Sequence, residues 1–97
     1  MYKLLLVDDE PEIREGLREV IRFEEYGFEV VGEAGNGAAA LQLAESLAPD
    51  LIITDIRMPL MDGLALCRRV RAVLPTTQFI ILSGYDDFEY ARQAIEV

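Results

Sequence analysis

The side chains in this sequence that could do chemistry are short polar ones that follow apolar runs. Asp8 and Asp9 directly follow one such run, Asp55 closes a second, and Ser83 follows a third. The chain holds no His, and Cys67 is its only Cys. Imidazole catalysis, metal sites built from His or several Cys, and disulfides within the chain are therefore excluded. A carboxylate is left as the obvious covalent nucleophile.

The aspartates predict a site for a divalent cation. If the segments that carry Asp8, Asp9 and Asp55 are neighbours, three carboxylates meet in one shallow cleft, where like charges raise one another's pKa. A hard cation compensates this charge, and Mg²⁺, or Mn²⁺ in its place, prefers oxygen ligands. A carboxylate beside such a cation can attack a phosphoryl group, and the hydroxyl of Ser83 can donate a hydrogen bond to a phosphoryl oxygen.

Each of these residues also has an ordinary structural role open to it. Asp8 or Asp9 can cap the helix that follows, Asp55 can form a turn before Pro59, and Ser83 can be a simple turn residue. These structural roles explain the residues one at a time. They do not explain why all of them follow buried apolar runs.

The elements that must position these residues alternate between strands and helices. Strands are expected over residues 4–7, 28–34, 50–55 and 78–82, and helices from Pro11, over 38–47, from Asp62-Gly63 up to Pro75, and from Asp86 or Asp87 onward. Short apolar strands separated by helices predict an α/β fold, a doubly wound parallel sheet with helices on both faces. Ligands of such sheets bind beyond the carboxyl ends of the strands, where the polar residues stand.

Acids and bases recur three or four residues apart along the first helix, which predicts exposed ion pairs: Glu10–Arg14, Glu15–Arg18 and Glu19–Arg22.

Length and charge limit the classes of function. The chain has 97 residues, enough for one domain, and 18 acids against 9 bases give a net charge of −9. A nucleic acid backbone repels such a chain, so this segment is not itself a DNA-binding module. No apolar run approaches the roughly 18 residues of a membrane span, and the short N-terminal stretch is no signal peptide. We expect a cytoplasmic location without membrane contact.

Three motifs, taken together, resemble the receiver domain of two-component response regulators. They are LLVDDE at residues 5–10, DIRMP at 55–59 with Asp62-Gly63, and ILSG at 81–84, and the likeness runs from residue 3 to the end. The resemblance implies a flavodoxin-like receiver fold with strand order 2-1-3-4-5. Here the expected form is (βα)4, truncated from (βα)5, with strand order 2-1-3-4.

The resemblance also implies a role for each polar residue. Asp55 would accept a phosphoryl group from the phosphohistidine of a sensor histidine kinase. Asp8 and Asp9 would hold Mg²⁺ with Asp55, and the backbone carbonyl of Arg57 would complete the protein ligands. Ser83 would bond the phosphoryl group and report the switch. A receiver of this kind is a phosphorylatable switch rather than a turnover enzyme.

The sequence departs from the family's pattern at its C-terminal end. The fifth strand, the fifth helix and the Lys that pairs with the phosphoryl group are not in this chain, and Lys3 cannot replace that Lys because it precedes the first strand. Residues 1–97 are thus expected to be one receiver domain that is incomplete at its C-terminus. The run Phe79–Leu82 would then lie in an apolar edge strand, which predicts self-association or a homodimer through this strand.

Two further segments, 23–32 and 84–91, are similar to receivers attached to AraC-type DNA-binding output domains. Transcription would then be the output, with DNA contacted only by an output domain absent from this chain. Two alternatives remain open. One is an interaction module that works without phosphorylation. The other is a small Mg²⁺ phosphatase, although phosphatases similar to haloacid dehalogenases need an Asp-x-Asp pair and Asp8 and Asp9 are adjacent.

Overall fold

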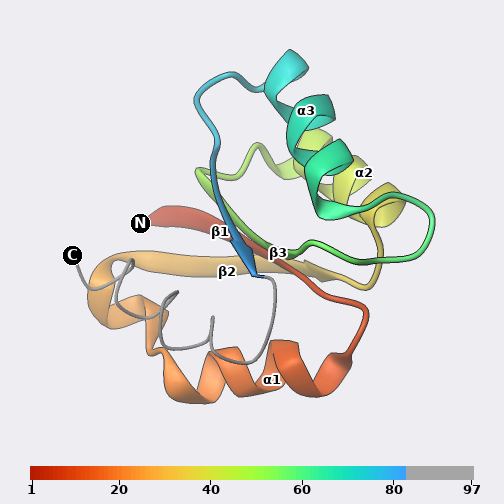
Figure 1. Cartoon of the computed structure of the whole chain (residues 1–97). Coiled ribbons are helices and arrows are strands. Elements are labelled where there is room, and N and C mark those ends of the chain that lie inside the picture. The colour runs from red at the N-terminus through yellow and green to blue at the C-terminus, as the bar shows by residue number, and fades with distance from the viewer. Residues whose placement is uncertain (83–97) are drawn as a thin grey trace.

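Four parallel strands form one sheet in the order β2-β1-β3-β4 (Figure 1). The computed structural model describes residues 1–82. The strands are β1 (Tyr2–Val7), β2 (Phe28–Ala34), β3 (Leu51–Asp55) and β4 (Gln78–Leu82), and the helices are α1 (Pro11–Val20), the 3-10 helix η1 (Phe23–Tyr26), α2 (Gly37–Leu47) and α3 (Gly63–Val73). The predicted strand order 2-1-3-4 is confirmed. Ser83 and the helix expected after it lie outside the described residues.

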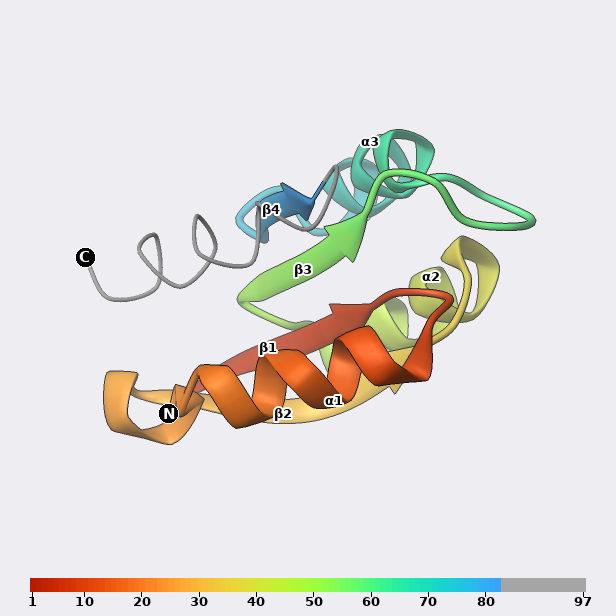
Figure 2. The same ribbon diagram turned by 60° about the horizontal axis from the view of Figure 1, so that its bottom comes forward.

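The helices cover both faces of the sheet, as the alternating pattern predicts. Helix α1 lies on one face, and α2 and α3 lie together on the other (Figures 1 and 2). Strand β1 runs through the middle, and its side chains alternate between two apolar cores. Leu4 and Leu6 pack on the α1 side, whereas Leu5 and Val7 pack on the side of α2 and α3. A strand buried on both faces needs a continuous apolar run, which is the pattern of LLLV.

The helices begin where local chemistry favours a start. Pro11 occupies the first turn of α1, where its missing N–H leaves no bond unmade. The side chain of Asn36 accepts a hydrogen bond from the Ala39 N–H at 2.8 Å and caps α2. Asp62 accepts from the Ala65 N–H at 2.8 Å and caps α3, the helix expected to begin at Asp62-Gly63.

Strand β2 contains one more residue than its pairing with β1 uses. Leu4 is the register partner of Val30, but the next residue, Leu5, is the partner of Gly32. The register therefore shifts by one residue at Val31. The side chains after Val31 emerge from the opposite faces to those that an unbroken alternation would give them. As a result Glu33 emerges on the α1 face of the sheet, where it meets two arginines of α1.

The ion pairs predicted along α1 are wrong. Arg14 and Arg18 both bind Glu33 of β2, with Nε–Oε distances of 3.0 and 2.8 Å, and Arg22 lies 3.7 Å from Glu25 of η1. None of the three predicted pairs is among the ion pairs of residues 1–82. A pair within one exposed helix contributes only about 0.2–0.5 kcal/mol. The carboxylate of Glu33 offers its two oxygens to two guanidinium groups, and this geometry favours the contact between α1 and β2.

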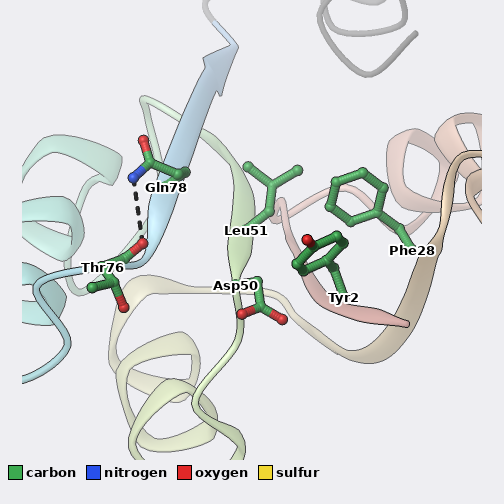
Figure 3. Close-up of a pocket in the computed structure, with 6 residues that line it drawn as sticks. All are labelled: Tyr2, Phe28, Asp50, Leu51, Thr76 and Gln78. Carbon is green, nitrogen blue, oxygen red and sulfur yellow. Dashed lines mark hydrogen bonds between the residues drawn. The ribbon is translucent and has the colours of Figure 1, made fainter. Parts of the chain in front are cut away.

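The amino ends of the strands carry a pocket of about 320 Å³ (Figure 3). Its lining comes from the start of every strand and the segments just before β3 and β4: Tyr2, Phe28, Asp50, Leu51, Thr76 and Gln78. Lys3 lies at this end too, because its N–H donates to the Asp50 carboxylate at 2.7 Å and its Nζ donates to the Leu47 carbonyl at 3.1 Å. Lys3 is therefore remote from the acids at the carboxyl ends, as expected.

Within the described part of the chain, no helix is long and apolar enough to cross a membrane.

Candidate functional site

The acids of the motifs converge where β1 and β3 end. These strands are parallel neighbours, and Val7 is the register partner of Thr54. The residues that follow this pair must therefore emerge at the same edge of the sheet. Ligand oxygens of Asp8, Asp9 and Asp55 all lie within 4.8 Å of one another. The predicted meeting of three carboxylates is thus present in the fold.

Asp8 is the buried member of this trio, with only 5% of its surface exposed. The pKa of its carboxyl is raised from 3.8 to about 6, chiefly by burial and to a smaller extent by the charges of Asp55 and Asp9. A hydrogen bond from the Glu10 N–H to Asp8 Oδ1, 2.9 Å long, opposes this rise. Asp9 is exposed and Asp55 half-buried. The three carboxyl groups therefore differ in exposure to water, and Asp8 is the one that burial affects most.

Asp55 is held by its own backbone and by β4. The Ile56 N–H donates to Asp55 Oδ1 at 2.8 Å and also reaches the Leu82 carbonyl at 3.1 Å. Leu82 is the register partner of Asp55, so the last residue of β4 lies beside the backbone of Asp55. No residue among 1–82 donates a hydrogen bond to Asp55 Oδ2. One oxygen of this carboxylate is thus oriented by a hydrogen bond, and the other accepts none from residues 1–82.

The loop between β3 and α3 is held close to the site by two glycines. A Cβ on Gly63 would lie 2.3 Å from the carbonyl oxygen of Asp55, and a Cβ on Gly37 would lie 2.1 Å from the carbonyl oxygen of Met61. Neither approach is open to a residue with a side chain. Arg57 lies exposed in this loop, two residues after Asp55, which is consistent with a backbone role. Leu60 of the same loop has a left-handed φ of 72° and is 83% exposed.

Two residues of this region were missed by sequence reasoning. Arg14 Nη1 donates a hydrogen bond to the backbone carbonyl of Asp8, and Arg14 Nε binds Glu33. The sequence placed Arg14 on the exposed face of the helix, paired with Glu10. No local sequence signal predicts the contact with Glu33, because the face from which Glu33 emerges depends on the register shift at Val31.

The donor set fits a hard divalent cation. Burial raises the pKa of Asp8 most, and the charges of Asp55 and Asp9 add to the rise, so a bound cation would offset negative charge at this site. All three candidate ligands are carboxylates, which suit Mg²⁺ and Mn²⁺ and not softer metals. The residues present therefore match the group that the sequence predicts.

A comparison with protein families decides the identity of the domain. The model of the response regulator receiver domain matches residues 4–97, nearly the whole chain. The chain belongs to this family. The receiver is 46% identical over 96 residues to the uncharacterized transcriptional regulatory protein YesN of Bacillus subtilis, and 43% identical over 96 residues to the transcriptional regulatory protein HptR of Staphylococcus aureus. In both alignments 99% of this receiver is covered, but it spans only 26% of the length of YesN and 37% of HptR.

Solved structures agree with this assignment. The receiver domain of AraT, a response regulator from Geobacillus stearothermophilus, superposes with a TM-score of 0.82 at 46% identity, covering 98% of this chain and 74% of that one. A two-component transcriptional regulator AraC from Clostridium phytofermentans gives a TM-score of 0.82 at 36% identity, covering 97% and 73%. The flavodoxin-like receiver fold predicted from the sequence is confirmed. The domain is a signalling switch of the kind found in transcriptional response regulators.

Proposed function

We propose that Asp55 of this receiver accepts a phosphoryl group, and that Asp8, Asp9 and the carbonyl of Arg57 hold Mg²⁺ beside it. The observation that carries the proposal is the convergence of the three carboxylates within 4.8 Å at the carboxyl ends of β1 and β3. Asp55 is the acceptor because one of its oxygens is oriented by the Ile56 N–H while the other has no donor among residues 1–82. Asp8 Oδ1 already accepts from Glu10 and lies buried.

The transfer forms one bond and breaks one. Asp55 Oδ2 attacks the phosphorus of a phosphohistidine, and the P–N bond breaks with its electron pair moving to the imidazole nitrogen, which takes a proton from solvent. The products are an acyl phosphate on Asp55 and a neutral histidine. Mg²⁺, when bound, neutralises charge on the carboxylates and on the phosphoryl oxygens. The chain itself orients Oδ1 through the Ile56 N–H and brings the backbone of α3 close through Gly63.

Ser83 belongs to the same proposal. Its hydroxyl would donate a hydrogen bond to a phosphoryl oxygen on Asp55. In support, Ser83 directly follows Leu82, whose register partner is Asp55. This role makes Ser83 the residue through which the state of Asp55 is passed on.

We infer the setting of the switch from the relatives. YesN and HptR are named transcriptional regulatory proteins, and this receiver spans about a quarter to two-fifths of their lengths. A sensor histidine kinase would donate the phosphoryl group in the cytoplasm. An output domain would contact DNA in response, since the net charge of −9 makes the receiver itself a poor DNA ligand. Residues 1–97 would act as one receiver domain that turns over no substrate of its own.

Labelling with acetyl phosphate and Mg²⁺, followed by the intact mass, tests this function. The wild type should gain one phosphoryl group, and Asp55→Asn should gain none. Asp50→Asn is the matched control, because Asp50 directly precedes the same strand at its other end, where it accepts a hydrogen bond from Lys3. Full labelling of Asp55→Asn would move the acceptor to Asp8 or Asp9.

Two other outcomes would replace the proposal. A wild type that neither binds Mg²⁺ nor gains mass from acetyl phosphate or a kinase phosphohistidine would be an interaction module that works without phosphorylation. Steady release of phosphate from a generic phosphomonoester, at many turnovers per chain, would make the domain a phosphatase. The complete acid set speaks against the first outcome, and the adjacency of Asp8 and Asp9 speaks against the second.

A further inference from the structure

A closed ring of contacts passes through the backbone of Asp8. The Asp8 N–H donates to the Ala34 carbonyl at 3.1 Å, and the Asp8 carbonyl accepts from Arg14 Nη1. Arg14 Nε donates to Glu33 Oε1 at 3.0 Å, and Glu33 is the residue directly before Ala34. The backbone of Asp8 is therefore held on both sides by the last two residues of β2, with Arg14 as the bridge.

The bridge depends on the face from which Glu33 emerges. If β2 continued its alternation through Val31 without the register shift, Glu33 would emerge beneath α2, away from Arg14. The shift places it on the α1 face instead. The side chains of Arg14 and Glu33 are 18% and 33% exposed, so the contact is partly withdrawn from water. A partly buried guanidinium with two bonds in fixed directions is a firmer anchor than a mobile surface pair.

We propose that Arg14 is the positioning residue for the acidic pair, setting the affinity of the site for Mg²⁺ through the Asp8 carbonyl. This inference rests on the proposed function, because it assigns Arg14 to the same metal site. The carbonyl that Arg14 binds belongs to the peptide plane that leads into Asp9. Holding this plane fixes the direction in which the exposed Asp9 side chain leaves the backbone. It also presents the Glu10 N–H to Asp8 Oδ1 at 2.9 Å.

Arg18 is a natural comparison for Arg14, because both residues form an ion pair with Glu33. Arg18 Nε binds the other oxygen of Glu33 at 2.8 Å, so both arginines tie α1 to β2. Among residues 1–82, however, Arg14 alone donates to the Asp8 carbonyl. Arg18 is more exposed, with 45% of its side chain accessible. The two arginines thus share Glu33 as a partner and differ in that Arg14 also binds the Asp8 carbonyl.

The experiment compares Arg14→Met with Arg18→Met, both of which keep much of the aliphatic stem and remove the guanidinium. The affinity for Mg²⁺ is measured by titration of the unphosphorylated chain at a temperature where a melt shows each variant folded. We expect Arg14→Met to weaken Mg²⁺ binding by roughly tenfold, the lower end of the loss seen when partners of metal ligands are removed. Arg18→Met should bind Mg²⁺ within about twofold of the wild type. Arg14→Lys, whose ammonium lacks the rigid two-pronged donor geometry of a guanidinium, should fall between them.

Amide hydrogen exchange in the metal-free chain supplies a second readout. The amides of Asp8 and Glu10 should exchange faster in Arg14→Met than in the wild type, and Arg18→Met should leave them unchanged. If the proposed function fails and the wild type binds no Mg²⁺, this exchange still reports whether Arg14 holds the loop. Equal Mg²⁺ affinity in Arg14→Met and the wild type would overturn the inference. So would equal losses in both variants, which would reduce Arg14 to a support of the helix.

Discussion

The backbone carbonyl of Asp55 lies where a side chain on Gly63 would have to stand, since a Cβ there would be 2.3 Å from that oxygen. The Gly63 N–H donates to the Ile56 carbonyl at 2.9 Å in the same turn. The first residue of α3 and the end of β3 are thus in backbone contact. The packing leaves room for a hydrogen atom and for nothing larger.

Gly63→Ala should therefore both destabilise the receiver and disturb Asp55, the proposed acceptor. The added methyl group must push the end of β3 away from α3, for which overpacking data suggest a loss of about 1–3 kcal/mol. Chemical denaturation gives the stability, and the rate of acetyl phosphate labelling gives the effect on Asp55. Gly35→Ala is the control, because its Cβ would meet only Arg14 Nη1 at an ordinary 3.7 Å. Similar stability and rate in both variants would contradict the close packing.

The Asp8 carboxyl should make the metal-free receiver less stable as the pH rises. Its pKa is raised from 3.8 to about 6 in the folded chain, so the folded state binds this proton more tightly than the unfolded state. The stability it contributes is present below the unfolded value and is lost as the pH climbs through the folded one. The full shift corresponds to at most about 3 kcal/mol.

Asp8→Asn isolates this effect, because an amide oxygen can still accept the Glu10 N–H. Without metal, the variant should be more stable than the wild type at about pH 7.5, and this advantage should shrink towards about pH 4. Urea denaturation across this range measures it. Saturating Mg²⁺ should raise the stability of the wild type more than that of the variant. An advantage that stays constant with pH would show that desolvation of Asp8 is not its source.

The two capping side chains should each contribute about 1 kcal/mol to stability. Asn36→Ala removes the bond to the Ala39 N–H, and Asp62→Ala removes the bond to the Ala65 N–H. Asp62→Asn keeps an accepting oxygen and should recover most of the loss, apart from the smaller attraction between a negative charge and the helix N-terminus. Urea midpoints compare the variants. If Asp62→Ala were as stable as the wild type, the cap would be a minor contact.

Strand β4 should make the 97-residue chain self-associate as salt is added. Among residues 1–82, β4 pairs only with β3, and its run from Phe79 to Leu82 is apolar. The net charge of −9 opposes association until salt screens it. Sedimentation from about 0.05 to about 0.5 M salt measures the effect, which Ile80→Lys should suppress. Val20→Lys changes an exposed apolar residue of α1 and serves as control. A monomer at every salt concentration would exclude association through this edge.

The elements that follow simple periodic rules could be predicted from the sequence. The buried run LLLV could only be a central strand, and Pro11 and Asp62 mark helix starts through their own local chemistry. Strand β4 has the predicted bounds Gln78–Leu82. The convergence of Asp8 and Asp55 also follows, because it needs only two parallel neighbours that end at one edge.

The surroundings of the acids could not be predicted, because they depend on contacts between distant segments. Glu33 binds Arg14, 19 residues earlier, and only the register shift at Val31 brings them to one face. Charge spacing along α1 pointed instead to neighbours within the helix, whose attraction is weaker than the tertiary contact. The burial that separates Asp8 from the adjacent Asp9 is likewise a property of the folded edge and not of the residue type.

Val31 has no partner in β1, and this extra residue decides from which face of the sheet Glu33 emerges. Side chains alternate between the faces, so one residue more or less before Glu33 changes its face unless the pairing shifts as well. Removing Val31 would give a strand that alternates regularly from Val30, and Glu33 would keep its face. An added residue between Gly32 and Glu33 would move the Glu33 carboxylate to the face covered by α2. Arg14 and Arg18 would then lose their ion pairs with Glu33. Strand β2 can therefore lose Val31 without disturbing the acids, but it cannot gain a residue between Gly32 and Glu33.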